Sequence, residues 1–112
     1  MGKGLSETIL LTKEREINPL IKEIIAILGR HLEAERYRVF LYGSWASMNA
    51  RPTSDIDIAV LGEGPIDEMV FLRVREEIDN LPTLRSIDIV DLAKADREFR
   101  DAVLRESEEL FL

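Results

Sequence analysis

Two short apolar runs with a polar loop between them stand in the middle of the chain, in the sequence VFLYGSWASMNARPTSDIDIAVL at residues 39–61. The first run, at residues 37–42, is rich in β-branched and aromatic residues and stops at a glycine, which predicts a strand. The second run, at residues 55–61, alternates Asp with apolar residues, and successive side chains on a strand point to opposite faces. Asp55 and Asp57 should therefore share one face of a sheet.

The rest of the chain alternates helical and strand patterns around these two runs. Asn18 and Pro19 are a typical N-cap and first helical residue, and apolar residues then recur at helical spacing as far as Leu32. The further expected elements are a helix at residues 66–81, a strand at residues 84–92 and a terminal helix that is capped by Asp96 and continues toward residue 112. This order predicts a small α/β domain with a mixed sheet of at least three strands flanked by helices.

Composition excludes several classes of site and partner. With 46% hydrophobic residues, a chain of 112 residues can bury the core of one domain. Its net charge of -7 disfavours a broad electrostatic contact with nucleic acid or anionic lipid. The absence of Cys and the single His exclude a disulfide framework and a thiolate or multi-His metal centre. Since no apolar run is long enough for a membrane span or a signal peptide, we expect a soluble, cytoplasmic protein.

The carboxylates of the second and third strands form a candidate metal site. Asp55 and Asp57 would repel each other unless a cation lies between them or one of them binds a proton. Asp88 interrupts the third apolar run in the same way, and Asp91, three positions later, should face the side opposite to Asp88, so only one of the two can join Asp55 and Asp57 if the strands are neighbours. Three carboxylates on adjacent strands suit Mg²⁺, which prefers hard oxygen ligands. The alternative is a plain α/β domain whose Asp residues lie on an exposed turn and strand edge.

The Gly-Ser turn that ends the first strand is a candidate phosphate site. Gly43 allows the backbone to approach a ligand closely, and Ser44 adds a hydroxyl donor to the free N–H groups of a following helical turn. Beside a carboxylate cluster, this turn indicates a nucleoside triphosphate site. Trp45 could stack on the base or cover the edge of the core, and both interpretations stay open. His31 is expected to be a surface or half-buried structural residue.

A family resemblance rests on the spacing of these two motifs. Gly43-Ser44, ten residues and then Asp55-Ile56-Asp57 resembles the G-S-x10-D-x-D signature of the DNA polymerase β-like nucleotidyltransferase superfamily. The size of the chain and the sequence ARPTSDIDIAVL resemble the minimal nucleotidyltransferase (MNT) branch of that superfamily. The resemblance extends from about residue 17 to the C-terminal helix.

The resemblance implies a role for each site residue. Asp55, Asp57 and Asp88 would be the catalytic residues and would bind Mg²⁺, as two ions, while Gly43 and Ser44 would hold the phosphates of ATP. In the implied reaction, an acceptor hydroxyl attacks the α-phosphate in line and pyrophosphate leaves. Asp88 would ligate the metal on the nucleophile side and accept the proton of the hydroxyl, directly or through that metal.

The turn departs from the pattern of many family members. They have G-S-x-A-R-G, whereas this chain has Ser47 and Met48 where the Arg and the second Gly would stand. Arg51, in the same loop, could partly replace the missing Arg as a nucleotide-binding residue.

The resemblance also implies a domain organisation and a partner. Residues 1–112 would form a single minimal nucleotidyltransferase domain, with an extra helix or arm at residues 1–16. Since no second domain is expected to hold the acceptor, another chain should supply it. The usual arrangement in the MNT branch is a toxin–antitoxin module, in which the antitoxin transfers AMP to a tyrosine of a HEPN-type ribonuclease toxin. No direct contact with nucleic acid or membrane is expected. The alternative is an inactive binding module that neutralises its partner by forming a complex.

Overall fold

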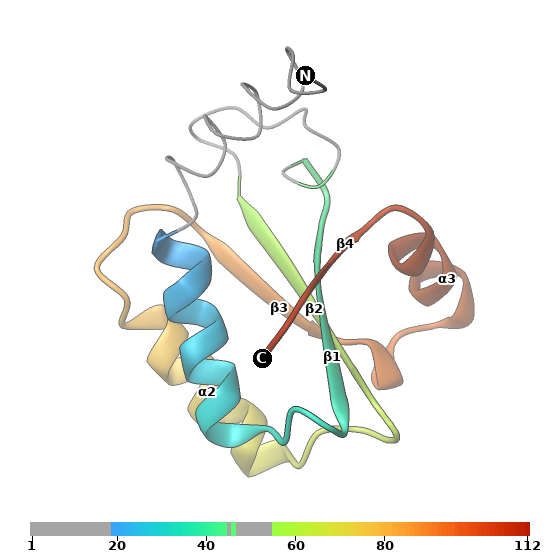
Figure 1. Cartoon of the computed structure of the whole chain (residues 1–112), viewed down its shortest axis with the longest axis horizontal. Helices are drawn as coiled ribbons and strands as arrows, with labels where there is room; N and C mark the ends of the chain where they lie inside the picture. Colours follow the sequence, from blue (N-terminus) through green and yellow to red (C-terminus); the bar gives the residue numbers. More distant parts are fainter. Residues whose placement is uncertain (1–18, 45, 47–54) are drawn as a thin grey trace, which may run out of the picture.

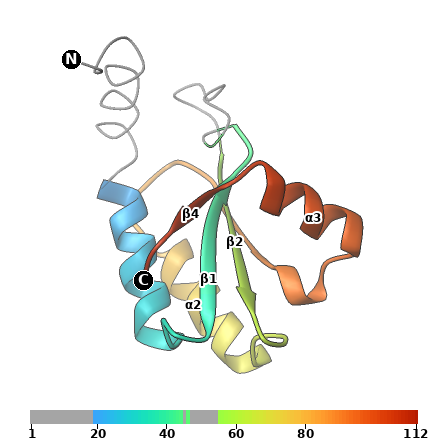
Figure 2. The same cartoon turned by 45° about the vertical axis from the view of Figure 1, so that its right-hand side comes forward.

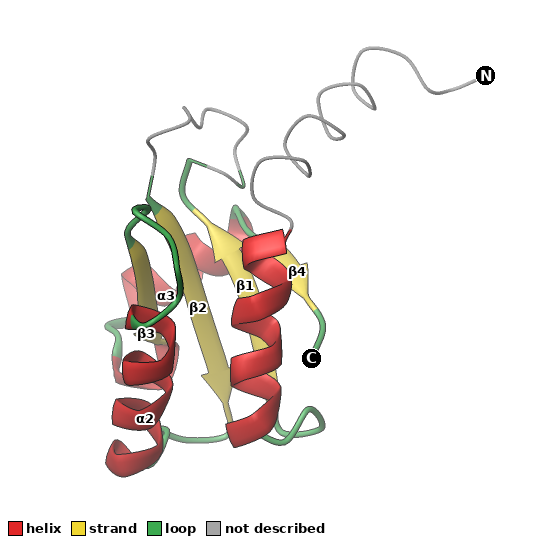
Figure 3. Ribbon diagram, turned by 90° about the vertical axis from the view of Figure 1, so that its left-hand side faces the viewer, coloured by secondary structure: helices red, strands yellow, loops and turns green. Residues whose placement is uncertain are grey.

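Helices cover both faces of a single sheet in this protein. The computed structural model describes residues 19–44, 46 and 55–112. The helical elements are the N-terminal helix, described at residues 19–31, α2 (Glu68–Asp79), the short 3₁₀ helix η1 (Leu92–Lys94) and α3 (Arg97–Arg105). Figures 2 and 3 show the N-terminal helix and α2 on one face of the sheet and α3 on the other. None of the described helices is long and apolar enough to cross a membrane.

The sheet has four strands, within the described part of the chain, in the order β3-β2-β1-β4 (Figure 1). β1 (Tyr37–Tyr42) pairs antiparallel with both β2 (Ile56–Gly62) and β4 (Glu108–Leu110). β3 (Ile87–Asp91) pairs parallel with β2, and α2 provides the connection between these two strands. The mixed α/β sheet predicted from the sequence is therefore confirmed.

Alternation along β2 explains why the two faces of the sheet differ. Ile56, Ile58 and Val60 are fully buried in the core beneath the N-terminal helix and α2. Ala59, on the other face, belongs to a smaller core that includes Val103 of α3. Since side chains alternate along a strand, Asp57 lies on the same face as Ala59. The larger core therefore anchors one face of β2, while the opposite face of the strand carries the charge of Asp57.

Aspartates cap the N-termini of α2 and α3, the two α-helices whose first turns are described in full. The Asp67 carboxylate accepts hydrogen bonds from the backbone N–H groups of Met69 and Val70, and the Asp96 carboxylate accepts one from Phe99. Such caps satisfy N–H groups that have no partner inside the helix. The predicted cap at Asp96 is confirmed.

Asp91 is a buried carboxylate with a structural role. Its Oδ2 accepts a hydrogen bond of 2.9 Å from the Ile66 backbone N–H, and its Oδ1 accepts one of 3.1 Å from that of Ala93. The bond from Ile66 joins the end of β3 to the segment before α2, and the bond from Ala93 caps η1. As the sequence predicted, Asp91 faces away from Asp88.

The C-terminal segment differs from the prediction. A terminal helix was expected to run on toward the end of the chain, but α3 ends at Arg105 and the following residues form β4. The reason is tertiary: Leu110 and Leu112 pack against the larger core, and β4 pairs with Val39–Leu41. The expected cap at Asn18 and the arm at residues 1–16 lie outside the described residues.

We expect Asp91→Asn to destabilise the fold. An amide keeps only one acceptor oxygen, so either the buried N–H of Ile66 or the partly buried N–H of Ala93 would face a donor. The expected loss is about 1–3 kcal/mol in the free energy of unfolding, measured by urea denaturation. Asp79→Asn, an exposed change in the last turn of α2, is the matched control. Equal stability of the two variants would contradict the structural role of Asp91.

Candidate active site

Three polar side chains form a row across the sheet on the face that α3 partly covers. Tyr42 of β1 is in register with Asp57 of β2, which is in register with Asp88 of β3. Residues in register on neighbouring strands share a face, so the structure brings together two of the three predicted carboxylates. Asp55, the third, is exposed and directly precedes β2. The row lies where β1 ends and where β2 and β3 begin (Figure 1).

Burial and neighbouring negative charges raise the pKa of two groups in this row, Asp57 and Tyr42. Burial raises the pKa of Asp57 above its ordinary value of 3.8, and the charges of Asp88 and Asp55 raise it further. Burial also raises the pKa of the Tyr42 hydroxyl to about 12, with additional contributions from Asp57 and Asp88. A cation bound between the carboxylates would reverse the repulsive part of these shifts.

Gly43 gives the chain room to turn directly beside Asp57. Its φ is +75°, in the left-handed region that favours glycine. A Cβ at this position would lie 2.4 Å from Oδ2 of Asp57, so only glycine fits without displacing the carboxylate. Ser44 follows in the same turn and is partly buried. Trp45, Ser47, Met48 and Arg51 lie outside the described residues.

The donor set of the row is compatible with Mg²⁺ but does not form a complete cage. Among the described residues, no three acidic or histidine side chains lie close enough together to hold a metal ion. Mg²⁺ is often bound by one or two carboxylates and by substrate phosphates. The in-register pair Asp57 and Asp88 fits this second pattern.

Two neighbours of the row were not predicted from the sequence. Phe99 of α3 packs edge-on against Tyr42, with ring centroids 5.9 Å apart and an interplanar angle of 86°. Arg75 of α2 forms an ion pair with Asp88, with 3.9 Å between Nη1 and Oδ1. Of the residues in and around the row that were not predicted, only Tyr42 could have been found from the sequence, because it directly precedes Gly43. Phe99 and Arg75 reach the row through the packing of helices against the sheet.

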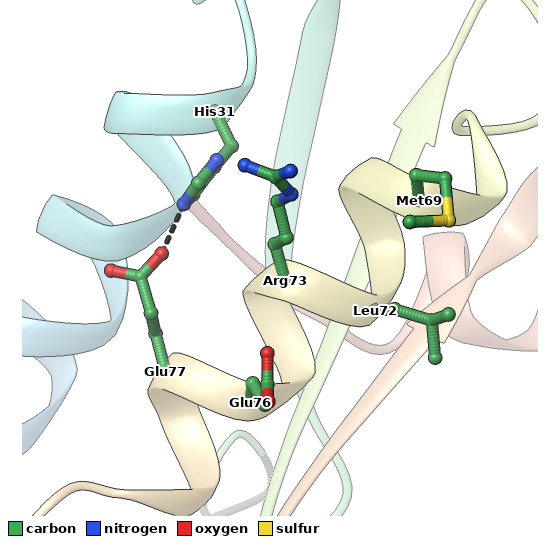
Figure 4. A pocket seen from close by; sticks show the side chains of 6 residues that line it. All are labelled: His31, Met69, Leu72, Arg73, Glu76 and Glu77. Atoms are coloured by element: carbon green, nitrogen blue, oxygen red, sulfur yellow. Dashed lines mark hydrogen bonds and ion pairs between the residues drawn. The ribbon is translucent and has the colours of Figure 1, made fainter.

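A separate hollow lies between the N-terminal helix and α2 and does not include the carboxylates. Its volume is about 670 Å³, and it is lined by His31, Met69, Leu72, Arg73, Glu76 and Glu77. Figure 4 shows His31 and Glu77 paired across the two helices. The Glu77 carboxylate also accepts a hydrogen bond from Arg30. His31 is therefore half-buried and joins two helices, in agreement with the structural role expected from the sequence.

Comparison with known proteins identifies a family and one curated relative. The model of the family described as "Polymerase beta, Nucleotidyltransferase" matches residues 22–112. A protein of Haemophilus influenzae named "Probable protein adenylyltransferase MntA" is 28% identical over 67 residues. That match covers 60% of this chain and 59% of the relative, so the chain aligns with little more than half of the relative's length.

Solved structures share the fold. A chain from the crystal structure of a toxin–antitoxin with AMP-PNP has a TM-score of 0.64 and 25% identity, over 80% of this chain and 71% of the other. A chain from the complex of a tri-AMPylated Shewanella oneidensis HEPN toxin with its MNT antitoxin has a TM-score of 0.58 and 23% identity. This second match covers 88% of this chain and 71% of the other. The expected small nucleotidyltransferase fold is confirmed.

We expect Gly43→Ala to lower stability and to move the Asp57 carboxylate. A left-handed backbone costs an alanine about 1–2 kcal/mol, and the clash with Oδ2 adds to this. Urea denaturation measures the loss. Gly64→Ala is the matched control, because a Cβ there would meet no atom within 4 Å. If both variants are as stable as the wild type, Gly43 is not required for the turn.

We expect Asp57→Asn to stabilise the protein at neutral pH. Because the pKa of Asp57 is raised in the folded protein, its charged form costs stability at neutral pH. This cost disappears as the pH falls below 3.8, where the carboxyl is protonated in both the folded and unfolded states. The urea midpoint of the variant should therefore exceed that of the wild type at pH 7 and approach it near pH 3.

An exposed carboxylate provides the control for this pH dependence. Glu63→Gln removes one negative charge just after β2, where the side chain is exposed. Its urea midpoint should differ little from that of the wild type across the same pH range. A midpoint of Asp57→Asn at or below the wild type at pH 7 would argue against a pKa of Asp57 raised by burial and repulsion.

Proposed function

We propose that this chain, which belongs to the polymerase beta nucleotidyltransferase family because the model of that family matches residues 22–112, transfers AMP from ATP to a hydroxyl of a partner protein. The observation that carries this proposal is the in-register opposition of Asp57 and Asp88 beside the exposed Gly43, whose missing Cβ leaves room for the Asp57 carboxylate. Family membership supports the transferase chemistry. The geometry supports a site for a cation and phosphates at this end of the sheet.

Each residue of the site has a proposed part in the reaction. Asp57 and Asp88, with Asp55 at the mouth of the site, would hold Mg²⁺. Bound there, Mg²⁺ would act as a Lewis acid on the triphosphate. The turn at Gly43 and Ser44 would receive the phosphates, and Arg51 remains a proposed nucleotide contact. Asp88 is well placed to accept the proton of the acceptor hydroxyl, because its side chain is 65% exposed.

The proposed acceptor is a tyrosine hydroxyl of a HEPN-type ribonuclease toxin. Support comes from the similarity to the adenylyltransferase MntA and to chains from toxin–antitoxin structures. One of those structures contains AMP-PNP, and another contains an AMPylated HEPN toxin. On this proposal the chain is a cytoplasmic, ATP- and Mg²⁺-dependent antitoxin that inactivates its toxin by AMPylation.

A second candidate function is neutralisation by binding alone. It is favoured by the lack, among the residues that the structure describes, of a complete group of three metal ligands. The loss of the family's usual Arg and Gly from the turn also favours it. In that case, the same fold would cover the active site of its partner without transferring a nucleotide.

The experiment that separates these two functions uses ATP labelled at the α-phosphate, Mg²⁺ and, as the candidate partner, the protein encoded next to this chain. Wild-type protein should transfer label to the partner, because its carboxylate row can hold the metal and the triphosphate. The double variant Asp55→Asn/Asp57→Asn should reduce label transfer at least 100-fold, about 3 kcal/mol of transition-state stabilisation. Mass spectrometry of the labelled partner would identify the modified residue.

A charge-matched double variant provides the control. Glu63→Gln/Asp79→Asn removes two exposed carboxylates outside the row, and it should transfer label as the wild type does. Neutralisation of the toxin is measured in parallel. No label with the wild type, together with undiminished neutralisation by Asp55→Asn/Asp57→Asn, would replace the transferase proposal with neutralisation by contact.

A further inference from the structure

We propose that Arg75 is a further phosphate-binding residue of the site, supplied by α2 rather than by the Gly-Ser turn. This inference rests on the proposed function. In the structure, the Arg75 guanidinium is paired with Asp88. When Asp88 binds the metal, Arg75 is released to bind the non-transferred phosphates of the nucleoside triphosphate.

The route of the Arg75 side chain supports this role. Ile87 and Ile89, on either side of Asp88, pack into the core beneath α2, so Asp88 points to the opposite face. Among the strands that the structure describes, β3 lies at the edge of the sheet and pairs only with β2. Arg75 therefore reaches Asp88 around the open edge of the sheet, which brings a cation from the helical layer to the rim of the carboxylate row.

The geometry of the ion pair leaves Arg75 free to change partners. The 3.9 Å separation exceeds the 2.7–2.9 Å typical of a charge-assisted hydrogen bond. The side chains of Arg75 and Asp88 are 39% and 65% exposed, so solvent weakens their attraction. A loose, exposed pair at the edge of a site is readily exchanged for a stronger one.

The chemistry of the ligand explains why a triphosphate would be that stronger partner. A guanidinium presents donors in a planar fork that matches two phosphate oxygens, whereas a metal-bound carboxylate has less charge to offer. A triphosphate must also approach a row of carboxylates on a protein of net charge -7. The Arg that many family members carry in the turn is absent here. Arg75 supplies a cation to the same row from another element.

The test compares the binding of a fluorescent, non-hydrolysable ATP analogue in the presence of Mg²⁺. Arg75→Gln should weaken this binding about 10- to 100-fold, since hydrogen bonds between charged groups contribute about 1.5–3 kcal/mol. Arg75→Lys should recover part of the loss, because it keeps the charge without the planar fork. Arg73→Gln is the matched control: it removes the same charge from the same helix, at the separate hollow of Figure 4, and should stay within about twofold of the wild type.

A second measurement separates phosphate binding from a merely structural contact. Mn²⁺ binding without nucleotide, followed by electron paramagnetic resonance, should be unchanged or tighter in Arg75→Gln, because a competing cation has left Asp88. Mn²⁺ binding weakened as much as nucleotide binding would overturn the inference and make Arg75 a tether of Asp88. Circular dichroism and urea midpoints of the variants verify that each one folds.

The two proposals fail in different ways. If the wild type binds the analogue and Arg75→Gln binds it equally well, the inference about Arg75 is wrong and the proposed function stands. If the wild type binds neither Mn²⁺ nor the analogue, the proposed function fails and the inference fails with it. Weaker analogue binding by Arg75→Gln, with Mn²⁺ binding retained and Arg73→Gln unaffected, supports the inference.

Discussion

The repulsion between the in-register carboxylates of Asp57 and Asp88 is the constraint that the rest of the fold must offset at this end of the sheet. The parallel pairing of β2 and β3 puts these carboxylates in register on one face, and partial burial makes the charged form of Asp57 less favourable. The fold supports this arrangement through apolar burial along β2, because Ile56 and Ile58, on either side of Asp57, are fully buried. Apolar burial on one face of β2 therefore offsets unfavourable electrostatics on the other.

The two faces of the sheet divide stability and chemistry between them. The N-terminal helix and α2 cover one face with a continuous apolar core, while α3 covers only part of the other (Figure 3). At the end of the sheet that carries the row, Phe99 of α3 packs on Tyr42, beside Asp57. Asp55 and Asp88 are exposed there, so both carboxylates are accessible to solvent.

Much of the fold could be predicted because its elements are encoded locally. The strand at residues 37–42 matches β1, and β2 differs from the prediction by one residue at each end. The Asp96 cap also lies where expected. β4 could not be predicted, because three residues with two glutamates carry no clear strand pattern. Pairing with the edge of β1 and the packing of Leu110 make that segment a strand.

The candidate site shows the same division. The sequence by itself determined which residues carry the charge and which faces they share, because alternation along a strand follows from backbone geometry alone. Tertiary structure decided that Asp57 lies opposite Asp88, since the register between two strands separated by a helix depends on how all their apolar side chains pack. It also decided that Arg75 meets Asp88 around an open strand edge. No local pattern encodes that meeting, because it depends on where α2 lies against the sheet.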